Sequence, residues 1–136
     1  MWRRIGELAD GAATELSGYQ MFGVLAFLQH VPDRERAEKA CLGIGPLLFD
    51  RGLVALEPDA PGEVHTPLDF APFPDSVARP LFEEAVISTD LDRLAAAQLD
   101  DGGWTFNWLA WSPAATADWR GYITVEVLRI LRGNGR

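Results

Sequence analysis

Hydrophobic side chains recur at helical spacing along most of the chain. In the regular segments an apolar residue returns every three or four positions, which gives an α-helix one continuous apolar face. The pattern therefore predicts an all-α protein in which antiparallel helical hairpins form a single domain. The expected helices cover residues 13–30, 33–49, 76–98 and 115–132, with a further short helix within 1–10. The expected loops cover residues 50–75 and 99–114.

Residues that cap or break helices mark several of these boundaries. Pro32 ends one helix, and Asp33 is a typical N-cap of the next. Ser112 followed by Pro113 is the same kind of signal at the start of the last helix. Thr89, followed by an acidic residue three places on, predicts a second cap and a break within 76–98.

The central loop, residues 50–75, is rich in proline, which disfavours helices and strands. It also carries apolar side chains, among them Leu68, Phe70 and Phe73. Because apolar side chains favour burial, we expect an ordered loop that packs on the protein rather than a linker between two domains.

Two of the expected helices match each other when the chain is shifted by 103 residues. Gly18-Tyr19 then falls on Gly121-Tyr122, and the remaining identities are Val24 on Val127, Leu25 on Leu128 and Leu28 on Leu131. A glycine inside an apolar helix suggests that a neighbouring element approaches closely. The match predicts a structural repeat of helical hairpins, as in solenoids and toroids.

Between the last two expected helices lies the run Gln98-Leu-Asp-Asp-Gly-Gly-Trp104. The run resembles the QW-type repeat of squalene–hopene cyclases, protein prenyltransferase β-subunits and their relatives. The resemblance is clearest over residues 89–132 and weaker over 13–50. It implies an α/α toroid, of which this chain supplies only some of the hairpins, so the barrel is either truncated or completed by association.

The resemblance also implies structural roles within the motif. The Gln98 side chain is expected to bond backbone groups at a neighbouring helix end, and Trp104 to pack on a helix face. Gly102 and Gly103 permit the sharp turn between them. A buried indole N–H requires an acceptor, which agrees with a packing role for the tryptophan.

Charge and composition narrow the class of protein. Twenty acidic against twelve basic residues give a net charge of -8, which disfavours binding to nucleic acids. The single cysteine, Cys41, lies on the apolar face of an expected helix and fits a reducing cytoplasm. The longest apolar run, Met21 to Leu28, is far shorter than the ~20 residues of a membrane span, and no signal peptide is visible. We therefore expect a cytoplasmic protein.

The candidate catalytic residues are aspartates. The cyclases of the resembled family use an Asp-x-Asp-Asp general acid, whereas this chain has Asp90-Leu-Asp92-Arg, with arginine in place of the last aspartate. Asp100 and Asp101 in the glycine turn are further candidates. The alternative is that these carboxylates cap helix ends. The histidines and Cys41 lack the spacing of metal ligands, so neither a metal nor a cofactor is expected.

Aromatic residues gather after the glycine turn. An apolar wall with a few polar groups is typical of a ligand pocket, so one hypothesis is a binding protein for an isoprenoid-like molecule. The alternatives are that these rings form the core, that the chain is a homodimeric interaction module, or that it is a terpenoid cyclase- or prenyltransferase-like enzyme. The candidate ligand-binding residues are Trp104, Trp108, Trp111, Trp119 and Tyr122, with Phe106 among them in the same cluster.

Overall fold

The computed structural model describes residues 1–13, 15–57, 65–106, 108 and 110–136. All regular secondary structure within these residues is helical, which confirms the predicted all-α class. The elements are α1 (Trp2–Ala9), α2 (Gly18–His30), α3 (Arg34–Ile44), α4 (Pro46–Asp50), α5 (Pro67–Phe70), the 3-10 turn η1 (Arg79–Leu81), α6 (Glu84–Ala96) and α7 (Pro113–Gly133).

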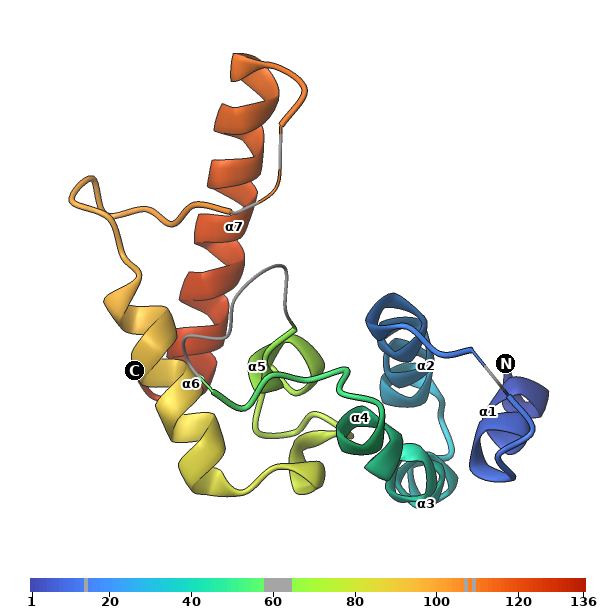
Figure 1. Cartoon of the computed structure of the whole chain (residues 1–136). Coiled ribbons are helices and arrows are strands. Elements are labelled where there is room, and N and C mark those ends of the chain that lie inside the picture. Colours follow the sequence, from blue (N-terminus) through green and yellow to red (C-terminus); the bar gives the residue numbers. More distant parts are fainter. Residues whose placement is uncertain (14, 58–64, 107, 109) are drawn as a thin grey trace.

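The helices form two groups on either side of α5 (Figure 1). Helices α1 to α4 make one group, in which α3 packs against both α1 and α2. Helices α6 and α7 make the other, and α5 packs on α6. The N-terminal half of α7 extends beyond the rest of the protein, so this helix is covered along only part of its length (Figure 1).

Caps fix the start of each long helix where the sequence offers them. The Ser17 hydroxyl accepts the Gln20 N–H and the Gln20 side chain accepts the Ser17 N–H, which is a complete capping box. As predicted, Asp33 caps α3 and Ser112 caps α7. Because α2 begins only after Ser17, the predicted start at residue 13 is wrong for the described residues.

Other predicted boundaries are also corrected. The helix expected over 33–49 is divided at Gly45, because Pro46 has no N–H to continue the ladder and instead begins α4. The helix expected from residue 76 begins at Glu84, after η1. It does not break at Thr89, whose hydroxyl bonds the Ala85 carbonyl inside the helix.

The proline-rich loop contains a short helix that was not predicted. Thr66 and Asp69 form a capping box around α5, in which Asp69 Oδ2 accepts the Thr66 N–H at 2.7 Å. Leu68 and Phe70 are buried in the core, so this part of the loop packs down as expected. Residues 58–64 lie outside the described part of the chain.

One apolar core joins the helices. Helix α2, which is apolar almost all round, contributes Met21 and Leu28, whose side chains are fully buried. Cys41 of α3 is buried beside them, and loss of water raises the pKa of its thiol to about 11. The cysteine is therefore a packing residue, protonated at neutral pH.

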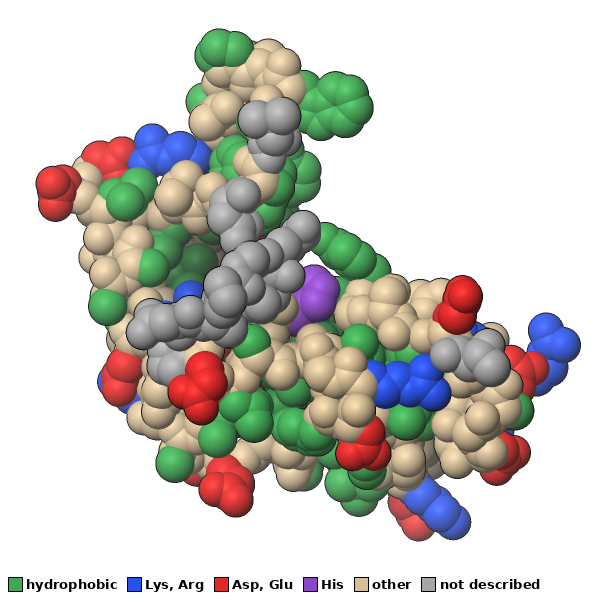
Figure 2. Space-filling view, in the orientation of Figure 1, with side chains coloured by type: hydrophobic (Ala, Val, Ile, Leu, Met, Phe, Trp, Pro, Cys, Tyr) green, Lys and Arg blue, Asp and Glu red, His purple; other side chains and the backbone are tan. Residues whose placement is uncertain are grey.

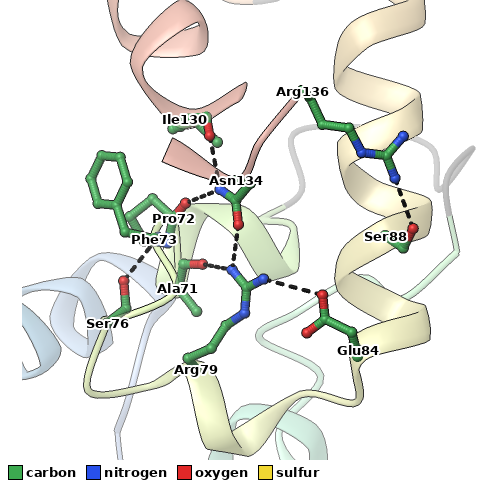
Figure 3. A network of polar contacts seen from close by, with 10 residues as sticks. All are labelled: Ala71, Pro72, Phe73, Ser76, Arg79, Glu84, Ser88, Ile130, Asn134 and Arg136. Atoms are coloured by element: carbon green, nitrogen blue, oxygen red, sulfur yellow. Dashed lines mark hydrogen bonds and ion pairs between the residues drawn. The ribbon is translucent and has the colours of Figure 1, made fainter. Parts of the chain in front are cut away.

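A polar network holds the C-terminal end of α7 against the segment that precedes α6 (Figure 3). Arg79 donates to the Asn134 side chain at 2.9 Å, and Asn134 donates to the Pro72 carbonyl at 2.8 Å. Nearby, Arg136 donates to the Ser88 hydroxyl on α6. The C-terminal half of α7 is thus fixed at its end, whereas its N-terminal half is held by the turn that follows α6.

Candidate functional site

A groove lies between α2 and the N-terminal half of α7. Its volume is ≈ 810 Å³, within the range of small-molecule sites. Figure 2 shows the molecule hollowed beside the upright helix, where α7 rises above the rest of the protein. The residues that line the groove are Tyr19 and Phe22 of α2, Thr105, Phe106 and Trp108 of the connecting loop, Trp119, Tyr122 and Ile123 of α7, and His65, Thr66, Asp69 and Arg93 at its floor.

The wall on the α7 side is a chain of aromatic rings. Phe106 stacks on Trp108 with 4.5 Å between ring centroids. Trp108 in turn meets Trp119 at 5.5 Å and 90°, and Trp119 meets Tyr122 at 5.8 Å and 87°. Neighbouring rings at right angles present a face and an edge to the same space, so this wall forms an aromatic corner.

The opposite wall is built around His65. Its ring lies edge-on to Phe22, with centroids 4.7 Å apart, and to Tyr19 at 5.2 Å. The ring also covers Gly18, where a side-chain Cβ would collide with it. The absence of a side chain at this glycine is therefore what allows His65 to sit against α2.

The floor combines two aspartates and one arginine. Arg93 is committed to Asp90, whose Oδ1 accepts from its Nε at 2.8 Å, while Asp90 Oδ2 accepts the Leu68 N–H at 2.9 Å. Asp69 is exposed and lines the groove, where protein atoms displace part of the water around its carboxyl. This loss of water raises the pKa of the Asp69 carboxyl, although its bond from the Thr66 N–H opposes the effect.

A second cavity of ≈ 470 Å³ continues from the groove along α2. The two cavities share Phe22 and Asp69, so they meet at these side chains. The second cavity is bordered by apolar side chains that include Leu25, Phe70 and Phe73. Together the two cavities give the site an elongated shape, with aromatic rings at one end and further apolar surface at the other.

The five predicted ligand-binding residues lie in three different places in the structure. Trp108, Trp119 and Tyr122 line the groove. Trp104 is only 3% exposed and belongs to the core, where its indole N–H donates to the Leu94 carbonyl at 2.7 Å. Trp111 is 97% exposed and does not border the groove.

The run from Gln98 to Trp104 fastens α6 to α7. The Gln98 side chain donates to the Gly102 carbonyl at 2.8 Å, within the same turn rather than at a neighbouring helix end. Gly102 has φ +83°, which favours glycine, and the Trp104 N–H donates to the Thr124 hydroxyl of α7. Gly103 lies close to this hydroxyl as well. The motif therefore positions the start of the aromatic wall.

None of the candidate catalytic aspartates in the described residues lines the groove itself, although Asp90 lies behind its floor as the partner of Arg93. Asp90 is buried and paired with Arg93, and Asp92 pairs with Arg136 at the surface. Asp101 accepts from Arg120 of α7 and from the Gly103 N–H, which lower the pKa of its carboxyl. Asp100 is exposed in the same turn. Asp90, Asp92 and Asp101 thus each stabilise a helix or the turn.

Sequence reasoning missed the α2 side and most of the floor of the groove. His65 was interpreted only as a histidine without the spacing of a metal ligand, and Arg93 only as a departure from a catalytic motif. Tyr19 carried a signal, because the 103-residue shift places it on Tyr122, and both tyrosines line the groove. Phe22, by contrast, read as one of many apolar positions in α2.

Two further properties bear on function. Among the described residues no group of three or more histidine, cysteine, aspartate or glutamate side chains is arranged to hold a metal ion. In the same part of the chain, no helix combines the length and the apolarity needed to cross a membrane. Comparisons with protein-family models, with curated proteins and with solved structures gave no match to this chain.

Proposed function

We propose that the protein binds an elongated, apolar small molecule of isoprenoid type in the groove between α2 and α7. The observation that carries the proposal is the aromatic wall of Trp108, Trp119 and Tyr122, which faces the rings of Tyr19 and Phe22 across an open cavity. Apolar side chains left open to water on both sides of a cavity favour a ligand that covers them.

The shape of the site supports an elongated ligand. A chain of isoprene units has the width of a side chain and a length of several side chains, which fits two cavities joined at Phe22 and Asp69. On the floor, the charge of Arg93 is already compensated by Asp90. The extended aromatic walls therefore favour binding through shape and apolar contact.

Intrinsic fluorescence tests the proposal. Trp108 and Trp119 lie in the groove, so farnesol or geranylgeraniol should change the emission saturably and raise Tm. Trp119→Leu removes part of the wall and should weaken binding by about tenfold. Trp111→Phe is the matched control, because this tryptophan is exposed outside the groove, and it should bind as the wild type does. Unchanged emission and Tm with both alcohols would contradict the proposal.

A second candidate function is self-association, supported by the surface of α7. Val125 and Leu128 are exposed there and lie three residues apart on the helix, and neighbouring apolar side chains on a surface favour an interface. A hairpin of α6 and α7 that forms part of an α/α toroid would complete its barrel in this way. Light scattering at micromolar concentration distinguishes the two states, and a dimer that Leu128→Glu dissociates is the expected result.

A further inference from the structure

We infer that the ligand of the groove carries an alkylated ammonium group, a tertiary or quaternary amine, at one end of its apolar body. The inference rests on the proposed function and adds the charge of the ligand's head. It assigns the head to the groove, between the aromatic wall of Trp108, Trp119 and Tyr122 and the carboxylate of Asp69, with the apolar body continuing past Phe22 into the second cavity.

The aromatic corner is the first reason. Each ring stands nearly at right angles to the next, with 90° between Trp108 and Trp119 and 87° between Trp119 and Tyr122. Rings in this arrangement form adjoining walls of a box rather than a flat stack. The negative faces of such rings attract a cation, and an alkylated ammonium suits them best because its alkyl groups also make apolar contact. A neutral chain would use only the second of these interactions.

The charge balance of the floor is the second reason. Arg93 donates to the Asp90 carboxylate through both Nε and Nη2, each at 2.8 Å, so these two charges compensate each other. Asp69 has no arginine or lysine partner within salt-bridge distance in the described residues, and its carboxylate borders both cavities. Its charged or titratable neighbours include His65, Asp90 and Arg93, and the second cavity that it borders is also lined by His30, Asp75 and Arg129, of which Arg129 pairs with Glu126.

These features also specify what the groove should reject. The carboxylate of Asp69 opposes an anion, and the protein as a whole has a net charge of -8. A phosphorylated or carboxylated apolar chain meets no free cation at the floor, because Arg93 is paired. Protein atoms displace part of the water around Asp69, which raises the pKa of its carboxyl, and a cation in the groove favours the ionised form.

Three probes of equal chain length test the inference: decyltrimethylammonium, decanol and decanoate, each titrated below its micellar concentration and followed by tryptophan fluorescence. The cation should bind about tenfold more tightly than the alcohol, and decanoate should bind most weakly. Asp69→Asn keeps an oxygen to accept the Thr66 N–H and should reduce the preference for the cation to within about threefold. Tyr122→Leu, at an exposed position, should reduce the same preference without unfolding the protein.

Asp118→Asn provides the matched control. It removes the same charge next to Trp119 but outside both cavities, so the preference for the cation should persist. If decanol binds as tightly as the cation, or if Asp69→Asn keeps the full preference, the inference is wrong while the proposed function stands. If none of the three probes binds, both are wrong.

Discussion

Helices α2 and α7 carry the same short sequence pattern, yet the fold treats them differently. In α2, neighbouring helices and loops together cover the apolar residues, and Leu25 is only 4% exposed. In α7 the matching residue, Leu128, is 46% exposed, and α6 is the main helix packed against α7 in the described residues. What the two share is the tyrosine of the Gly-Tyr pair, which in each helix faces the groove.

This comparison shows that a common pattern can be used for two purposes. Leu28 of α2 and Leu131 of α7 are both buried, so the C-terminal part of each helix belongs to the core. The N-terminal part of each helix forms one wall of the groove. Helix α2 is a fixed wall because it is packed on several sides, whereas the wall formed by α7 depends on the turn that ends at Trp104.

The largest difference between the two helices should appear when the matched leucines are shortened. Leu25→Ala removes a buried side chain and leaves a cavity, which should lower the free energy of unfolding by about 2–4 kcal/mol. Leu128→Ala removes an exposed side chain and should cost less than about 1 kcal/mol. Urea denaturation measures both. Equal losses would mean that α7 is covered as fully as α2, as a stable dimer through this face would require.

Replacing the two matched glycines by alanine should change the stability of the protein in opposite directions. A Cβ at Gly18 collides with the ring of His65, which Tyr19 and Phe22 hold in place, so Gly18→Ala should destabilise the protein by about 1–3 kcal/mol. Gly121 has open space around it within α7, so Gly121→Ala should stabilise by about 0.5–1 kcal/mol through its higher helix propensity.

Thermal denaturation of the two glycine variants provides the measurement, and ligand binding adds a second readout. Gly18→Ala displaces His65 and should also weaken binding in the groove, whereas Gly121→Ala should leave it unchanged. A stabilising Gly18→Ala would show that His65 moves aside at no cost, and the α2 wall would then be adaptable rather than fixed.

The sequence was sufficient for the helical class and for several helix starts, because those depend on local signals. Asp33 and Ser112 cap helices through bonds that reach only three residues along the chain. Such signals failed where a competing local bond was available. Thr89 could cap a helix or bond one turn back inside it, and the apolar face of α6 favours the second.

The groove could be predicted only on one side. One side is formed by aromatic residues that are close together in the sequence, namely Trp108, Trp119 and Tyr122, so their spacing and residue type were enough to suggest an aromatic wall. His65 and Asp69 come from the segment around α5 and Phe22 comes from α2, and only the long-range packing of α5 between α2 and α6 brings them to the same groove. Trp104 and Trp111 have the same residue type, but only packing decides that one is core and the other exposed.

The smallest expected effect is the difference in pH dependence between the carboxylates of Asp69 in the groove and Asp101 in the turn before α7. Burial raises the pKa of Asp69, so ionisation disfavours the folded state, and this cost appears as pH rises from below the ordinary pKa of the carboxyl through its raised value. The Arg120 side chain and the Gly103 N–H lower the pKa of Asp101, so its ionised form favours the folded state until pH falls through the lowered value. At neutral pH, Asp69→Asn should therefore raise Tm slightly and Asp101→Asn should lower it slightly. Both differences from the wild type should shrink as acidification protonates the two carboxyls, which Tm measured from pH 7 to pH 3 would show. Both variants changing Tm in the same direction at neutral pH would mean that the pKa values of the two carboxyls are not shifted in opposite directions.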